Sequence, residues 1–177
     1  RGCSRRRLPL LVLRRRHAVG PARLIQRLRR DPPRRPRRQR YGGALTNEEL
    51  IDFARRYTAA WCSHDAASVA AFFSEGGSLT VNDGEPAVGR SSITEVVQGF
   101  YDAFPDTVVL MDAARGAGGH GVYLWTYEGT NNGPGGTGHA VRFSGWEKWT
   151  FSSDGLIEVS DGRFDAAEYE RQLAEGI

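Results

Sequence analysis

One acidic residue stands out because of its neighbours. Glu147 lies in residues 140–151, a segment whose composition is typical of a strand. Side chains alternate between the faces of a strand, so Glu147 shares a face with Trp149 and Phe151, and Trp146 takes the other face. A carboxyl group among aromatic rings loses hydration, which raises its pKa and allows it to donate or shuttle a proton. The alternative is that this face lies outward at a dimer interface, where Glu147 pairs with an arginine.

Further candidates come from a helical face and from aromatic residues along the chain. Tyr57 falls on the apolar face of a helix predicted from Thr46 to Trp61, where a tyrosine is either a core residue or a pocket hydroxyl. Aromatic walls suit a flat apolar ligand, and a polar residue at the mouth of a pocket can add a hydrogen bond. The candidate ligand-binding residues are Trp61, Phe100, Phe104, Trp125, Asn131 and Trp149.

Other residue types give no chemistry by their spacing. Asp65 is better placed to cap a following helix than to form an acid–base pair with His64. The histidines do not have the spacing of metal ligands, so we expect no metal and no cofactor. The glycine-rich residues 133–138 are not followed by a helix, which argues against a phosphate-binding loop.

The elements that position these residues follow in a simple order, with helices first and strands after. This order predicts an α+β fold in which a strongly curved antiparallel sheet wraps around the N-terminal helices and encloses a pocket. A short second helix is expected to carry Val69, Phe72 and Phe73 inward and to stop at Gly76-Gly77. The other predicted elements are strand 78–81, a helix from about residue 91 to 104, strands 107–112, 122–129, 140–151 and 156–161, and a closing helix 165–174.

Charge divides the chain of 177 residues into two segments. Residues 1–40 hold 16 of the 24 basic residues and one acid, a formal charge of +15 (16 minus 1). Residues 41–177 hold 8 basic residues and 20 acids, a formal charge of −12 (8 minus 20), so the whole protein is not a basic nucleic-acid binder. The Arg- and Pro-rich segment 1–40 is expected to be disordered. It is interpreted as a basic arm, a targeting segment, or a non-native translation of upstream GC-rich DNA.

Composition also limits the compartment. Only two cysteines, Cys3 and Cys62, are present, which favours a reducing compartment and a cytoplasmic protein. No apolar run approaches the roughly 18–20 residues of a membrane helix, so no membrane contact is expected.

The order of elements and several short motifs resemble the nuclear transport factor 2-like superfamily, and more narrowly its SnoaL-like polyketide cyclase group. Each motif is weak alone, but their order and spacing together span most of residues 46–173 and imply a cone-like fold. The motifs are Tyr57-Thr58-Ala59-Ala60-Trp61, His64-Asp65, Ala71-Phe72-Phe73-Ser74, Val88-Gly89-Arg90, Gly129-Thr130-Asn131-Asn132-Gly133, Asp154-Gly155-Leu156-Ile157 and Phe164-Asp165.

This resemblance implies roles for particular residues. Tyr57 falls on the helix tyrosine that donates to an oxyanion in the ketosteroid isomerase branch, and Glu147 falls on the second donor of that branch. The positions of the usual catalytic acids are Thr80 and Gly162 here. Asp161, beside Gly162, could take over the proton transfer only if a β-bulge turned it inward. The resemblance therefore predicts the catalytic set Tyr57, Glu147 and Asp161.

Two functions follow from this resemblance. The first is a cofactor-free isomerase or aldol-type cyclase that acts on a small apolar carbonyl compound. The second is a non-catalytic module of the same fold that binds an apolar ligand or dimerises. A pocket of a few hundred Å³ with convergent polar groups would favour the enzyme, and a filled cone would favour the module.

The resemblance also predicts the partners. A homodimer is expected through the outer sheet face, which should carry Trp146, Thr150 and Tyr123. Nucleic acid is expected as a partner only if segment 1–40 is genuine.

Overall fold

A computed structural model of the chain describes residues 45–177, so the predictions for segment 1–40 lie outside the described residues. The described part is an α+β fold with helices at its start and end and a six-stranded sheet. Its elements are α1 (Asn47–Trp61), α2 (Ala66–Ala70), β1 (Phe73–Val81), β2 (Ala87–Val88), α3 (Gly89–Ala103), β3 (Val108–Ala117), β4 (His120–Thr130), β5 (Ala140–Phe151), β6 (Ile157–Phe164) and α4 (Ala166–Glu175).

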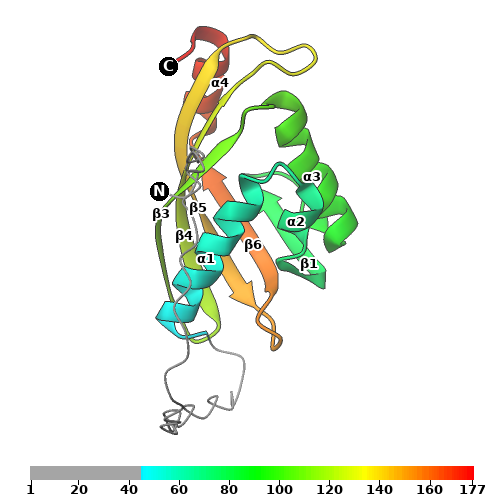
Figure 1. The fold of residues 1–177 in the computed structure, drawn as a ribbon, viewed down its shortest axis with the longest axis vertical. Helices are drawn as coiled ribbons and strands as arrows, with labels where there is room; N and C mark the ends of the chain where they lie inside the picture. Colours follow the sequence, from blue (N-terminus) through cyan, green and yellow to red (C-terminus); the bar gives the residue numbers. More distant parts are fainter. Residues whose placement is uncertain (1–44) are drawn as a thin grey trace, which may run out of the picture. The chain divides into compact units, whose positions relative to one another are not determined.

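The sheet has the strand order β2-β1-β6-β5-β4-β3. Strands β3 to β6 form an antiparallel meander, as predicted, but β1 pairs with β6 in parallel. This parallel pair is possible because helix α3 and three long strands separate β1 from β6 in the chain. Helices α1, α2 and α3 lie over one face of the sheet, and α4 lies beside the long strand β5 (Figure 1).

Helix α1 begins with a capping box, as its sequence indicates. The Thr46 side chain accepts from the backbone N–H of Glu49, and the Glu49 carboxylate accepts from the Thr46 N–H. The helix then buries one face against the sheet, and Phe53 and Tyr57 on that face contact the Trp149 ring of β5. This packing fixes the part of α1 that reaches the candidate site.

Two local predictions differ from the structure. The second helix ends at Ala70, and Phe73 already belongs to β1, which is longer than the predicted strand 78–81. Gly76-Gly77 therefore do not stop a helix; they lie where the β1–β6 register shifts, and a Cβ on Gly77 would lie 2.7 Å from the Ile157 carbonyl oxygen. Strands β3 and β4 also extend further than predicted and meet at Gly118-Gly119, where both φ angles are positive, +61° and +83°.

The outer face of the sheet carries a patch of exposed apolar side chains. Trp146 is 40% exposed there, which confirms its predicted side of β5. Tyr123, predicted on this face, is buried instead, because it pairs directly with the inward-facing Glu147 in the β4–β5 register. The exposed apolar residues of this outer patch are Val122, Leu124, Trp146 and Val159.

No helix within residues 45–177 is both long enough and apolar enough to cross a membrane.

We expect this outer patch to form a homodimer interface, because four large apolar side chains exposed on one sheet face are costly to hydrate. A Trp146→Glu substitution should shift the full chain from dimer to monomer in light scattering. The two-fold symmetry brings one new carboxylate from each protomer into the interface, where the two charges repel each other. The control is Val88→Glu, which adds the same charge at an exposed apolar residue of strand β2 and should leave the dimer intact. A wild-type monomer would refute the dimer.

Candidate functional site

Glu147 is a buried carboxyl group on the inner face of β5, and its side chain is held by three donors. The residue is 6% exposed. Its Oε2 accepts from the Tyr57 hydroxyl at 3.2 Å, the Trp149 Nε1–H at 2.8 Å and the Ser160 hydroxyl at 2.8 Å. These donors come from α1, β5 and β6, so the carboxyl group joins a helix to two strands.

Burial raises the pKa of Glu147 above its usual value, and the three hydrogen bonds from Trp149, Ser160 and Tyr57 lower it by a smaller amount. Burial dominates because none of these donors carries a charge, and no lysine or arginine within residues 45–177 forms an ion pair with Glu147. The group is therefore suited to hold a proton nearer neutral pH than an exposed glutamate does.

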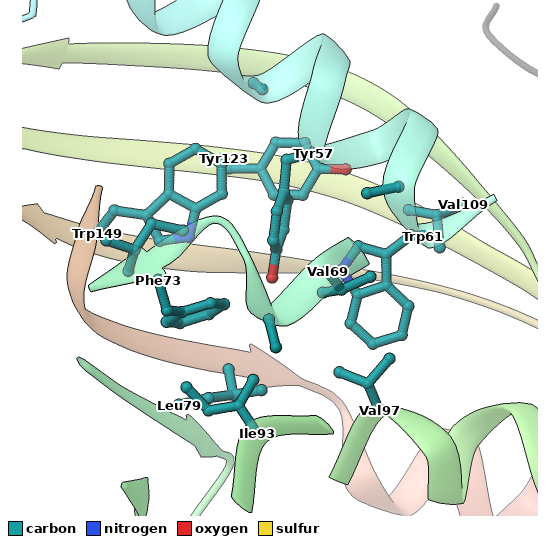
Figure 2. Close-up of a cluster of buried hydrophobic side chains, with 14 of the residues drawn as sticks. Tyr57, Trp61, Val69, Phe73, Leu79, Ile93, Val97, Val109, Tyr123 and Trp149 are labelled. Atoms are coloured by element: carbon teal, nitrogen blue, oxygen red, sulfur yellow. The ribbon is translucent and has the colours of Figure 1, made fainter. Parts of the chain in front are cut away.

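Tyr57 lies at the centre of the aromatic core. Its ring lies between the Tyr123–Trp149 pair and Trp61 (Figure 2). Its hydroxyl donates to Glu147, and burial, followed by the Glu147 charge, raises its pKa well above the usual value. Tyr57 therefore stays a neutral donor that positions the carboxyl group.

A cavity of about 50 Å³ lies against Glu147, between α1, α3 and the inner face of the sheet. Four of the lining residues, Val81, Phe100, Trp125 and Phe164, are partly exposed, which indicates that the pocket opens to solvent on their side. The full lining is Trp61, Leu79, Val81, Phe100, Val109, Tyr123, Trp125, Tyr127, Phe143, Glu147, Gly162 and Phe164.

The hydroxyl groups of the pocket already have partners. Tyr123 forms a hydrogen bond with Thr58, and Tyr127 forms one with Thr107, each at 2.7 Å. The Nε1–H of Trp125 is different, because it is buried and has no hydrogen-bond partner among the described residues. Glu147 and Trp125 are therefore the lining residues with polar capacity left for a ligand.

Three of the predicted ligand-binding residues line this pocket, namely Trp61, Phe100 and Trp125. The other three do not. Phe104 packs under Tyr127 and Tyr169, and the fully buried Trp149 donates to Glu147.

Asn131 holds its own loop and does not line the pocket mouth. Its Nδ2 donates to the Ala103 carbonyl oxygen, and its Oδ1 accepts from the Thr137 N–H.

Asp161 lies on the outer sheet face, away from Tyr57 and Glu147. The β5–β6 register runs without a break through Lys148–Asp161 and Glu147–Gly162, so no bulge turns Asp161 inward. Its carboxylate pairs with Arg163 at 3.0 Å. Gly162 faces the pocket instead.

Sequence reasoning missed Ser160 and Tyr123 as site residues. Alternation along β6 places Ser160 on the same face as Gly162, so strand parity could have identified Ser160. Alternation along β4 likewise places Tyr123 on the face of Trp125, a predicted ligand-binding residue, so strand parity could have identified Tyr123 as well.

A metal site is not formed by the described residues. Between residues 45 and 177, no group of three or more His, Cys, Asp or Glu side chains could hold a metal ion.

The fold and pocket define a class, the nuclear transport factor 2-like α+β proteins, in which a curved sheet and N-terminal helices enclose a small cavity. The sequence model of the SnoaL-like domain matches residues 54–159, more than half of the chain. The chain therefore belongs to the SnoaL-like domain family. No curated protein matches its sequence.

Solved structures share this fold at low sequence identity. A hypothetical protein with a ketosteroid isomerase-like fold from Catenulispora acidiphila, in complex with trimethylamine, is 16% identical with a TM-score of 0.63, covering 73% of this chain and 95% of its own. A protein from Jannaschia, provisionally named a SnoaL-like polyketide cyclase, is 13% identical with a TM-score of 0.61. The match covers 75% of this chain and 99% of the Jannaschia chain. AclR from Streptomyces galilaeus, provisionally named a hydroxylase, is 19% identical with a TM-score of 0.63, covering 73% and 83%.

At these identities the comparisons establish the fold that the chain shares with these proteins.

The raised pKa of Glu147 has a consequence for stability. The native state binds this proton more tightly than the unfolded chain, so the stabilisation is complete below the unfolded value of about 4.5 and is lost as pH rises through the native pKa. We expect Glu147→Gln to be more stable than wild type near pH 8 and to lose this advantage near pH 5. Each tenfold difference in proton affinity is worth about 1.4 kcal/mol.

Urea unfolding of the full chain followed by tryptophan fluorescence measures this difference. The control is Glu158→Gln, which removes an exposed carboxylate from β6 and should show no comparable pH-dependent gain. A Glu147→Gln protein that loses stability relative to wild type as pH rises would contradict the assignment.

The donors to Glu147 should control its pKa. Tyr57→Phe and Ser160→Ala each remove one hydrogen bond to Oε2, and both should raise the Glu147 pKa further, by on the order of one pH unit. Carbon-13 NMR titration of the glutamate carboxyl groups measures it, with Thr94→Ala, whose hydroxyl bonds only within α3, as the control. An unchanged or lower pKa in both variants would show that the donors do not hold the charged form.

Proposed function

We propose that the protein is an enzyme that binds a small apolar carbonyl compound in this pocket. In this proposal, Glu147 transfers a proton from one carbon atom of the compound to another. The observation that carries this proposal is a single carboxyl group with a raised pKa in an aromatic pocket, fixed through one oxygen by three neutral donors. A carboxyl group whose pKa is raised toward the working pH is an efficient proton acceptor and donor.

The proposed reaction moves a double bond into conjugation with a ketone. The ionised Glu147 removes a proton from the carbon between the carbonyl group and the alkene, and the C–H electron pair forms a dienolate. The protonated Glu147 then returns the same proton to the terminal carbon, and the carbonyl group forms again. One carboxyl group acts first as the base and then as the acid. The reaction therefore needs neither Asp161 nor a carboxyl group at the usual acid positions, which Thr80 and Gly162 occupy.

Two other residues support this step in the proposal. Tyr57 keeps Oε2 in place, because its hydroxyl is already committed to Glu147. The Nε1–H of the lining residue Trp125 is buried and has no partner among residues 45–177, and in the proposal it donates to the enolate oxygen. An aldol-type cyclisation would start from the same enolate, but a cavity of about 50 Å³ favours the smaller isomerisation substrate.

A second candidate function is binding without turnover. The cavity is far smaller than the few hundred Å³ typical of enzyme pockets. Neither usual acid position supplies a carboxylate to it, because Thr80 pairs with Asp161 on the outer face and Gly162 has no side chain. The Catenulispora acidiphila neighbour is in complex with trimethylamine, which supports small-molecule binding by this fold.

Isomerisation of 4-penten-2-one to its conjugated isomer, followed by ultraviolet absorbance, tests the first candidate. The full chain should accelerate the reaction, and Glu147→Gln should reduce the rate at least about a hundredfold because it removes the proton acceptor. Glu158→Gln is the matched surface control and should keep the wild-type rate. If Glu147→Gln turns the ketone over as fast as wild type, Glu147 does not transfer the proton.

A further inference from the structure

The charge balance of the pocket is unusual, because its one charged residue has no counter-ion among residues 45–177. Glu147 is the only Asp, Glu, Lys, Arg or His among the lining residues. The basic side chains of β5 and β6 are engaged elsewhere or exposed: Arg142 pairs with Glu128, Arg163 pairs with Asp83 and Asp161, and Lys148 is exposed. The ionised carboxylate therefore has no counter-charge among the described residues, and a proton or a bound cation can neutralise it.

The two carboxyl oxygens of Glu147 have different surroundings. All three protein donors, on Tyr57, Trp149 and Ser160, contact Oε2. No donor among the described residues contacts Oε1. One oxygen is thus fixed by the protein, and the other retains its full capacity as an acceptor.

The remaining walls of the cavity are aromatic and aliphatic. Aromatic ring faces attract cations through their quadrupole and also cover methyl groups. The hydroxyls of Tyr123 and Tyr127 are bonded to Thr58 and Thr107, so they do not compete for a polar ligand group. The aromatic members of the wall are Trp61, Phe100, Tyr123, Trp125, Tyr127, Phe143 and Phe164.

We propose that this pocket, with Glu147 ionised, is a binding site for a compact tertiary or quaternary alkylammonium ion. The rings cover the alkyl groups, and Oε1 of Glu147 faces the positive charge or accepts the ammonium N–H. The cavity of about 50 Å³ limits the ligand to small substituents of methyl size. This inference rests on the second candidate function, which is binding in this pocket without turnover. In the proposed isomerase, the alkylammonium ion would act as a competitive inhibitor.

A proton and the alkylammonium ion compete for the same carboxylate, so the affinity should depend on pH. Glu147 is faced by Tyr57 and Trp61 of α1, Tyr123 of β4, Trp149 of β5, and Ser160 and Gly162 of β6. Of these, only the tyrosines titrate, and burial raises the pKa of both well above the usual value, so they stay neutral. The affinity should rise with pH until Glu147 is fully ionised.

Calorimetric titration of the full chain with tetramethylammonium chloride tests the proposal, with tert-butyl alcohol as a neutral ligand of similar shape. We expect tetramethylammonium to bind at least about tenfold more tightly than the alcohol near pH 8, and this preference should shrink near pH 5. Glu147→Gln should remove the preference and keep the alcohol affinity, and Phe100→Leu should weaken cation binding by removing one ring. Glu158→Gln is the control for non-specific attraction to this acidic domain and should bind like wild type.

Two outcomes would overturn the inference: equal or tighter binding of tert-butyl alcohol near pH 8, or a cation affinity that does not change with pH or in Glu147→Gln. The pH series uses the wild-type chain, so the test holds even if Glu147→Gln does not fold. Turnover of 4-penten-2-one without tetramethylammonium binding would overturn this inference alone. Cation binding without turnover would support it and refute the isomerase.

Discussion

The burial of one carboxyl group in an aromatic core is the constraint on which the rest of this structure depends. An isolated charge there would cost several kcal/mol, so the surrounding elements must supply hydrogen bonds or the group must keep a proton. The chain does both in part: three neutral donors contact one oxygen, and the pKa remains raised. The positions of α1, β5 and β6 relative to one another are linked to this single side chain.

This arrangement links the stability of the fold to the proton affinity of Glu147. Replacement of Glu147 by an apolar residue would leave three buried donors without an acceptor, so the donors and the acid are interdependent. The donors are neutral, which keeps the proton affinity of the carboxyl group high. An arginine in their place would hold the group permanently ionised and remove its capacity for proton transfer.

Much of the fold could be predicted from the sequence because its signals are local. The capping box at Thr46 and the alternation around Glu147 each fix an element or a face within a few residues. The start of β1 could not be predicted, because a bulge in its pairing with the distant β6 replaces the helix stop that Gly76-Gly77 indicates, whereas its end at Val81 was predicted correctly. The outward assignment of Tyr123 is wrong, and the sequence itself opposes it, because alternation along β4 places Tyr123 on the face of the predicted ligand-binding residue Trp125.

The site was predictable only as a set of residues, and not as a set of contacts. Glu147 and Tyr57, both predicted from the sequence, lie together in the candidate site. The hydrogen bond between them joins residues 90 positions apart, so the sequence does not show that the Tyr57 hydroxyl already donates to Glu147. Asp161 depended on a bulge, and the continuous register leaves it on the outer face.

Gly162 has a consequence for the engineering of this fold. It pairs with Glu147 across β5 and β6, and a Cβ there would lie 3.5 Å from Glu147 Cγ and 3.3 Å from the Thr80 carbonyl oxygen. Its φ is not in the left-handed region, so a side chain at this position needs only a small backbone adjustment. An aspartate at residue 162 would place a second carboxyl group beside the first, and the two would share one proton as a coupled acid pair. A single codon thus separates this one-acid pocket from a two-acid pocket on the same scaffold.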